Sequence, residues 1–81
     1  VKYLSYLLSR NSKGRINEIV LGGVKHSTHK SEFINNYSTL VPMNRMCDEN
    51  EITGPIQFLL SSESSYMTGS SLVYDGGYLS I

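Results

Sequence analysis

Two histidines three residues apart, His26 and His29, are the first side chains in this sequence that suggest a chemistry. A His-x-x-His spacing can place two imidazoles on one side of a helix, and zinc sites use such pairs. A zinc site needs three or four protein ligands, and no third ligand of a suitable type is near, since Cys47 is far along the chain. We therefore expect two solvated loop histidines and no metal site.

Cys47 and Asp75 are the next candidates for chemistry. Cys47 precedes Asp48, which is predicted to begin a helix, and a helix N-terminus lowers the pKa of a nearby thiol. No neighbouring residue is a dedicated base, so a packing role is the simpler expectation for Cys47. Asp75 resembles a catalytic acid, but an aspartate before a glycine pair is expected to cap the turn through its own backbone.

Composition limits the classes of function before any element is placed. The chain has 81 residues, enough for one small domain, and seven basic residues balance seven acidic ones. No net field draws it to nucleic acid or to an anionic membrane. No apolar run approaches the roughly 18 residues of a membrane span. A single cysteine allows no internal disulfide, which favours a reducing, cytoplasmic setting.

The hydrophobic pattern predicts a helix followed by a strand in the first part of the chain. Leucines at helical spacing indicate an amphipathic helix over residues 1–10, with Gly14 as its left-handed cap. Residues 15–21 alternate and then become continuously apolar before Gly22-Gly23, which is typical of a strand in a covered, parallel sheet. The chain opens inside a helical pattern, so we expect a truncated sequence.

The second part predicts a long connection, a helix and a last strand. Residues 24–46 are polar and irregular, with one short helix expected around Glu32–Tyr37. Asp48 and Glu51 form a capping box for the next helix, which either kinks at Pro55 or restarts with Thr53 as its cap and Pro55 in its first turn. Residues 72–74 lie between turn signals and are expected to be a strand.

A strand, a long connection, a helix and a strand make a right-handed βαβ crossover with two parallel strands. Parallel strands need helices on both faces and neighbours at their edges. Two strands with two or three helices make a poor closed core. The pattern therefore predicts an α/β fragment that belongs to a larger domain or must associate.

Three groups of residues, taken in order, carry a resemblance to a known family. They are Arg15-Ile16-Asn17 with Gly22-Gly23-Val24; Pro42 to Arg45 with Glu51-Ile52; and Phe58-Leu59, Tyr66-Met67-Thr68-Gly69 and Asp75-Gly76-Gly77. In this order and spacing they resemble the closing part of the short-chain dehydrogenase/reductase family. The resemblance covers nearly all of residues 1–81 and implies the carboxyl-terminal part of a doubly wound Rossmann-like domain.

The resemblance implies an oxidoreductase that uses NAD or NADP and moves a hydride between the nicotinamide and a carbonyl or alcohol substrate. In that family a tyrosine, a lysine four residues later and a serine carry the reaction. No Tyr-x-x-x-Lys and no Gly-x-x-x-Gly-x-Gly occurs in this sequence. We expect no catalytic residue in this chain, which would be inactive alone, with the tyrosine and lysine a few residues before Val1.

The resemblance also assigns cofactor contacts at the end of the first strand. Gly22 matches the family's motif glycine, Gly23 follows it, and Val24 matches the residue whose amide faces the nicotinamide carboxamide. Leu21 stands where the family has proline, and His26 where it has a threonine that contacts the cofactor. A plain strand-ending turn at Gly22-Gly23 is the alternative interpretation.

Residues 25–46 resemble the family's substrate loop, in which Phe33, Tyr37 and Met43 are the apolar candidates for a substrate pocket. The alternative is that these aromatics only anchor the short helix on the sheet. The family forms subunit interfaces from the first helix, the last helix and the last strand, so a homo-oligomer is expected. Two functions remain open: a piece of an oxidoreductase, or a non-catalytic interaction module that associates with full-length relatives.

Overall fold

A pair of parallel strands organises the structure, a computed structural model that describes residues 1–80. β1 (Glu18–Leu21) pairs with β2 (Ser71–Tyr74) in parallel, with Glu18 opposite Ser71 and Leu21 opposite Tyr74. The predicted parallel pair in an α/β arrangement is therefore confirmed. A further parallel bridge joins Val24 to Cys47 and continues the pairing beyond the end of β1.

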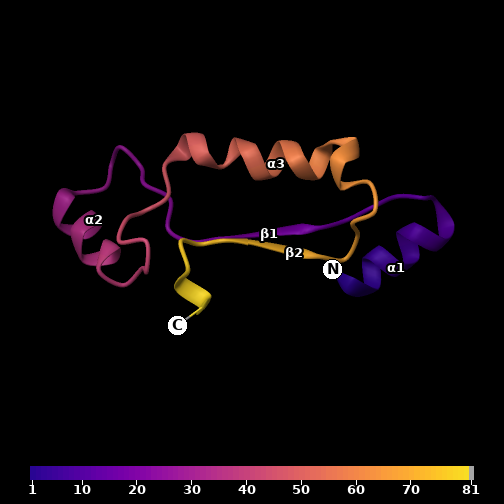
Figure 1. Cartoon of the computed structure of the whole chain (residues 1–81), viewed down its shortest axis with the longest axis horizontal. Helices are drawn as coiled ribbons and strands as arrows, with labels where there is room; N and C mark the ends of the chain where they lie inside the picture. The colour runs from indigo at the N-terminus through magenta and orange to yellow at the C-terminus, as the bar shows by residue number, and fades with distance from the viewer. Residues whose placement is uncertain (81) are drawn as a thin grey trace.

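Three helices surround the strands: α1 (Lys2–Asn11), α2 (Ser31–Ser38) and α3 (Thr53–Leu60). Short 3-10 turns precede and follow α3 and close the chain: η1 (Glu49–Glu51), η2 (Ser62–Ser64) and η3 (Tyr78–Ser80). In Figure 1, α3 runs along one side of the strands, α1 lies at their amino ends, and α2 lies beyond their carboxyl ends. The helices predicted at residues 1–10 and near Glu32–Tyr37 are confirmed.

The end of α1 differs from the sequence expectation. Gly14 was predicted to adopt the left-handed conformation, but Lys13 does so instead, with φ of 58°. The Gly14 amide still reaches back to the carbonyl oxygen of Leu8, at 3.3 Å. The helix therefore closes one residue earlier than glycine preference indicates.

The start of α3 resolves the alternatives at Pro55. Asp48 caps η1, because its Oδ1 accepts from the Asn50 amide at 3.1 Å and Glu51 Oε1 accepts from the Asp48 amide at 2.9 Å. The predicted capping box is present. α3 then begins at Thr53, with Ile52 as its N-cap and Pro55 buried in its first turn, where a missing amide hydrogen costs nothing. The helix restarts rather than kinks, but the prediction of Thr53 as its cap is wrong by one residue.

Little of the apolar surface is buried within residues 1–80. Besides Pro55, the buried apolar side chains are Val41 and Met46, both in the connection between β1 and α3. Leu4 of α1 is 52% exposed and Val73 of β2 is 49% exposed. The radius of gyration is 15.7 Å, compared with about 12 Å expected for a compact domain of this length. The structure is elongated, measuring 49 × 24 × 19 Å, as expected for an incomplete layer of a larger fold.

Candidate functional site

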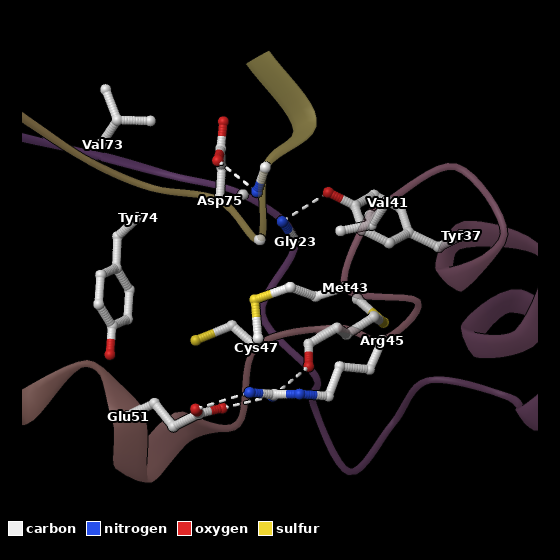
Figure 2. Close-up of a pocket in the computed structure, with 14 residues that line it drawn as sticks. Gly23, Tyr37, Val41, Met43, Arg45, Cys47, Glu51, Val73, Tyr74 and Asp75 are labelled. Carbon is white, nitrogen blue, oxygen red and sulfur yellow. Dashed lines mark hydrogen bonds and ion pairs between the residues drawn. The ribbon is translucent and has the colours of Figure 1, made fainter. Parts of the chain in front are cut away.

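A pocket of about 350 Å³ lies where β1 and β2 end (Figure 2). Ligands of α/β proteins bind outside the carboxyl ends of parallel strands, so this is the expected place for a site. The lining comes from both strand ends, from the connection between β1 and α3, and from η1. These residues are Gly22, Gly23, Tyr37, Val41, Met43, Arg45, Met46, Cys47, Glu51, Val73, Tyr74, Asp75, Gly76 and Gly77.

Glycines let the two strand ends and the connection approach one another. A Cβ on Gly22 would lie 3.0 Å from the Cα of Asp75, and a Cβ on Gly76 would lie 2.7 Å from Cγ1 of Val41. Gly76 also has φ of 64°, in the left-handed region. A larger residue at Gly22 or Gly76 would therefore push apart the segments that form the pocket.

Gly23 is in direct contact with Tyr37. The Gly23 amide donates to the Tyr37 hydroxyl at 2.6 Å, as Figure 2 shows. A Cβ on Gly23 would lie 2.4 Å from Cζ of the Tyr37 ring. Because Gly23 has no side chain, the Tyr37 ring can approach its backbone closely. This contact holds α2 against the end of β1.

Val24 and His26 lie outside the lining of this pocket. The bridge at Val24 uses the Lys25 amide, which donates to the Cys47 carbonyl at 2.7 Å, and the Cys47 amide, which donates to the Gly23 carbonyl at 2.9 Å. The Val24 amide takes no part in these two bonds. It therefore remains a candidate to bind a ligand at the end of β1.

His26 lines a second, more open groove of about 410 Å³, together with His29, Asp48 and Glu49. Its Nδ1 accepts from the Thr28 amide at 3.2 Å, and His29 Nδ1 accepts from the His26 amide at 3.1 Å. Both rings therefore hydrogen-bond the backbone of their own loop, residues 26–29. Within residues 1–80, no three histidine, cysteine, aspartate or glutamate side chains gather as metal ligands would.

The three predicted substrate residues divide into two roles. Tyr37 and Met43 line the pocket, and Met43 is 57% exposed. Phe33 does not line it. Its ring lies between His29, with a centroid distance of 4.8 Å, and Tyr37, at 6.3 Å. Phe33 thus contacts the tyrosine ring without lining the pocket.

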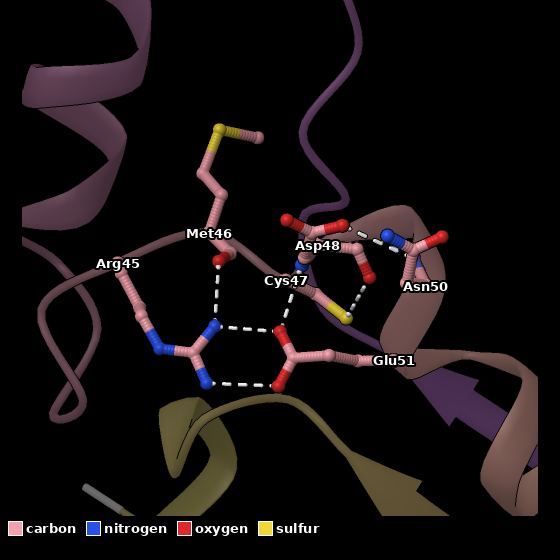
Figure 3. Close-up of polar contacts among 6 residues, drawn as sticks. All are labelled: Arg45, Met46, Cys47, Asp48, Asn50 and Glu51. Carbon is pink, nitrogen blue, oxygen red and sulfur yellow. Dashed lines mark hydrogen bonds and ion pairs between the residues drawn. The ribbon is translucent and has the colours of Figure 1, made fainter.

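An ion pair at the edge of the pocket was not predicted from the sequence (Figure 3). Arg45 binds Glu51 with both terminal nitrogens, at 2.7 and 2.9 Å, and also donates to the Met46 carbonyl at 3.2 Å. The bonds from Arg45 and from the Asp48 amide lower the pKa of Glu51 to about 2. The pair fastens the end of the connection to η1. Its sequence signal was an arginine shortly before a capping box.

The structure corrects the expected effect on Cys47. Burial raises the pKa of the Cys47 thiol, and the nearby Glu51 carboxylate raises it further. The Sγ atom donates to the Asp48 carbonyl at 3.3 Å. This direction is opposite to the lowering of the pKa that a helix N-terminus would give, so the surroundings of Cys47 do not activate it as a nucleophile.

Asp75 caps its own turn, as the sequence predicted. Its carboxylate accepts from the Gly77 amide at 2.9 Å and from the Leu79 amide at 2.9 Å. Both oxygens are therefore occupied by backbone donors.

Among the described residues, none of the helices has the length and apolar character needed to cross a bilayer.

The sequence matches a family model and several known proteins. The family model described as enoyl-(acyl carrier protein) reductase matches residues 1–79. The NADP-dependent mannitol dehydrogenase of Hypocrea jecorina is 38% identical over 69 residues, covering 79% of this chain and 25% of that protein. The post-translational flagellin modification protein A of Campylobacter coli is 34% identical over 68 residues, covering 84% of this chain and 26% of that protein. The chain spans about a quarter of the length of these relatives.

Solved structures match nearly all of the chain. A short-chain dehydrogenase from Leptospira borgpetersenii with bound NAD+ is 38% identical, with a TM-score of 0.83 over 95% of this chain and 30% of that one. A short-chain dehydrogenase family protein from Francisella tularensis is 26% identical, with a TM-score of 0.89 over 99% of this chain and 38% of that one. In both, the match is to about a third of a larger protein.

Proposed function

Because this chain belongs to the short-chain dehydrogenase/reductase family, we propose that it is the carboxyl-terminal part of an NAD(P)-dependent oxidoreductase. The reaction is hydride transfer between the nicotinamide and a small carbonyl or alcohol substrate. The observation that carries this proposal is the pocket at the carboxyl ends of β1 and β2, where α/β folds bind their ligands. A reducing cytoplasm is the proposed location, since Cys47 is the single cysteine.

Gly22, Gly23, Val24 and His26 are the proposed cofactor residues. Gly22 and Gly23 line the pocket at the end of β1, and the Val24 amide is not used in the bridge to Cys47. A nicotinamide carboxamide has both a donor and an acceptor for such groups. His26 contributes at most its Nε2 atom, because its Nδ1 accepts a hydrogen bond from the Thr28 amide. The relatives include an NADP-dependent enzyme and a structure with bound NAD+.

The substrate is proposed to lie against Tyr37 and Met43, with Phe33 supporting the tyrosine ring. The groups that transfer the proton in this family, a tyrosine and a lysine four residues later, have no counterpart in residues 1–81. We therefore propose that this chain binds and orients the cofactor and the substrate, while residues outside it transfer the proton. Alone, the chain is expected to be inactive.

A second candidate function is that of an interaction module without catalysis. Large apolar side chains are exposed on the three elements expected to form subunit contacts; they include Tyr3, Leu4 and Tyr6 of α1, Ile56, Phe58 and Leu60 of α3, and Val73 of β2. Monomers rarely leave so much apolar surface in water. Association with a second copy or with a full-length relative would bury it.

A graft tests the oxidoreductase proposal directly. Residues 1–80 replace the matching segment of the Hypocrea jecorina mannitol dehydrogenase, and NADPH binding is followed by fluorescence. We expect the graft to bind NADPH within about tenfold of the parent and to oxidise mannitol. A Gly22→Val graft is the control, because the valine side chain would meet the backbone of Asp75. It should lose most of its NADPH binding and most of its mannitol oxidation.

A graft that folds by circular dichroism but binds no NADPH contradicts the proposal. The Leptospira enzyme serves as a second host, so that a poor junction in one protein does not decide the result. The DNA upstream of the Val1 codon separates the two candidate functions. A Tyr-x-x-x-Lys and a glycine-rich loop there support a piece of an enzyme, whereas unrelated sequence supports an interaction module.

A further inference from the structure

The hydroxyl of Tyr37 is held as an acceptor and retains its own hydrogen. The Gly23 amide donates to it at 2.6 Å. A phenol can accept hydrogen bonds and donate one, so the bond from Gly23 leaves the donor function of Tyr37 unused. Accepting a hydrogen bond also polarises an O–H group and makes it a stronger donor.

Two contacts of the ring fix the position of this donor. The ring lies so close to Gly23 that an added Cβ would be 2.4 Å from Cζ. Phe33 also stacks on the ring, with a centroid distance of 6.3 Å and an angle of 30° between the rings. A donor whose side chain is already immobilised loses little entropy when it binds a ligand.

The surroundings favour an acceptor on the ligand. Tyr37 lines the pocket together with the apolar side chains of Val41, Met43 and Val73. A ligand that excludes water from this space must supply an acceptor for the Tyr37 hydrogen, because an unpaired buried donor costs free energy. A ligand without an oxygen at that point is therefore discriminated against.

We propose that Tyr37 is a positioning residue that donates its hydroxyl hydrogen to a carbonyl or alcohol oxygen of the substrate. This inference rests on the proposed function and deepens it. It assigns Tyr37 a polar role, where the sequence indicated only an apolar one. The substrate class that it selects carries a carbonyl or hydroxyl oxygen within reach of Tyr37, as sugar alcohols and hydroxyketones do.

The test uses the mannitol dehydrogenase graft with Tyr37→Phe, which keeps the ring and removes the hydroxyl. We expect KM for mannitol to rise roughly five- to tenfold, as for the loss of one neutral hydrogen bond. The value of kcat and the affinity for NADPH should stay within about twofold. Tyr66→Phe is the matched control, because Tyr66 is fully exposed and does not line the pocket, and it should change none of these.

A double-mutant cycle with substrate analogues separates positioning from a structural role. The monodeoxy mannitols are assayed with the parent graft and with the Tyr37→Phe graft. One of them should show no difference between the two proteins, because its missing oxygen is the acceptor. An unchanged KM, or a rise of equal size for every analogue, overturns the inference while the proposed function stands. A folded parent graft that binds no NADPH overturns the proposed function and this inference with it.

Discussion

The two ends of the strand pair are built in different ways. At the amino ends, side chains bond backbone across long stretches of sequence. Arg15 donates to the carbonyl oxygens of Ser64 at 2.7 Å and Met67 at 3.0 Å, and the Ser70 amide donates to the Asn17 side chain at 3.0 Å. At the carboxyl ends, glycines of both strand ends line a pocket instead.

The difference separates stability from binding along one axis of the molecule. The network at the amino ends joins the segment before β1 to the end of α3 and to the turn before β2. It satisfies backbone carbonyl and amide groups of both segments. The carboxyl ends keep their backbone accessible at Gly22 and Gly76. Substitutions at the two ends should therefore change different measured quantities, which the following variants test in the mannitol dehydrogenase graft.

The largest expected effect is on stability, from Arg15→Met. This change removes charged hydrogen bonds to the carbonyls of Ser64 and Met67. The Ser64 carbonyl loses the Arg15 donor, whereas the Met67 carbonyl keeps its bond from the Asn17 side chain. We expect the free energy of unfolding to fall by about 2–4 kcal/mol, measured by urea titration, with KM for mannitol unchanged. Lys2→Met removes the same charge from an exposed position and should cost less than about 0.5 kcal/mol. Equal losses from the two variants would contradict a stabilising role for the hydrogen bonds of Arg15.

Gly69→Ala should give the next largest effect, again on stability. Gly69 has φ of 72°, and a Cβ there would lie 2.5 Å from Oγ of Ser5. We expect a loss of about 2 kcal/mol, from backbone strain and from displacement of α1. Gly54→Ala is the matched control, because its Cβ meets nothing within 4 Å. In a helix that substitution should stabilise by about 0.5–1 kcal/mol, and thermal unfolding of both variants measures the contrast.

Gly23→Ala moves the test to the carboxyl ends, where binding rather than stability should change. The added methyl group displaces the Tyr37 ring from its place against Gly23. We expect KM for mannitol to rise by about tenfold, which is about 1.4 kcal/mol. In a Tyr37→Ala background the same substitution should change KM by less than about twofold, since the clash is gone. Additive effects in steady-state kinetics would contradict a shared role for Gly23 and Tyr37.

The smallest effect is expected from Glu51→Gln, and it depends on pH. Glu51 has a folded pKa of about 2, below its ordinary 4.5. The ion pair with Arg45 therefore contributes stability above about pH 4.5, which is lost as the pH falls towards 2. The difference in melting temperature between the parent graft and the glutamine variant should shrink over that range. Glu63→Gln removes the same charge outside this pair, and an identical pH profile for it would argue against the pair.

The local elements could be predicted from the sequence, because short-range patterns determine them. The helices near residues 1–10 and 32–37, the capping box of Asp48 and Glu51 and the turn at Asp75 all depend on neighbours within a few positions. The left-handed residue was misplaced by one, at Gly14 instead of Lys13. Glycine preference is a statistical tendency, and the bond from the Gly14 amide to Leu8 shifted the turn.

The contacts that define the site could not be predicted, because they join distant residues. Arg15 reaches partners about fifty positions away, at Leu59, Ser64 and Met67. Gly23 was expected to allow the approach of a ligand, and no local pattern indicated that Tyr37, fourteen positions later, would occupy that space. Arg45 and Glu51 were noted as matching positions, but their pairing depends on how the connection turns into η1.

The small amount of buried apolar surface has a thermal consequence. The heat capacity of unfolding reflects the apolar surface newly exposed to water, and a compact domain of 81 residues would show about 1.0–1.2 kcal/mol/K. Within residues 1–80, Val41, Met46 and Pro55 are the apolar side chains that the chain itself buries. Its own unfolding should therefore show a much smaller heat capacity change, with a broad transition and a nearly flat stability curve. The ordinary value should return only when another polypeptide covers the remaining surface.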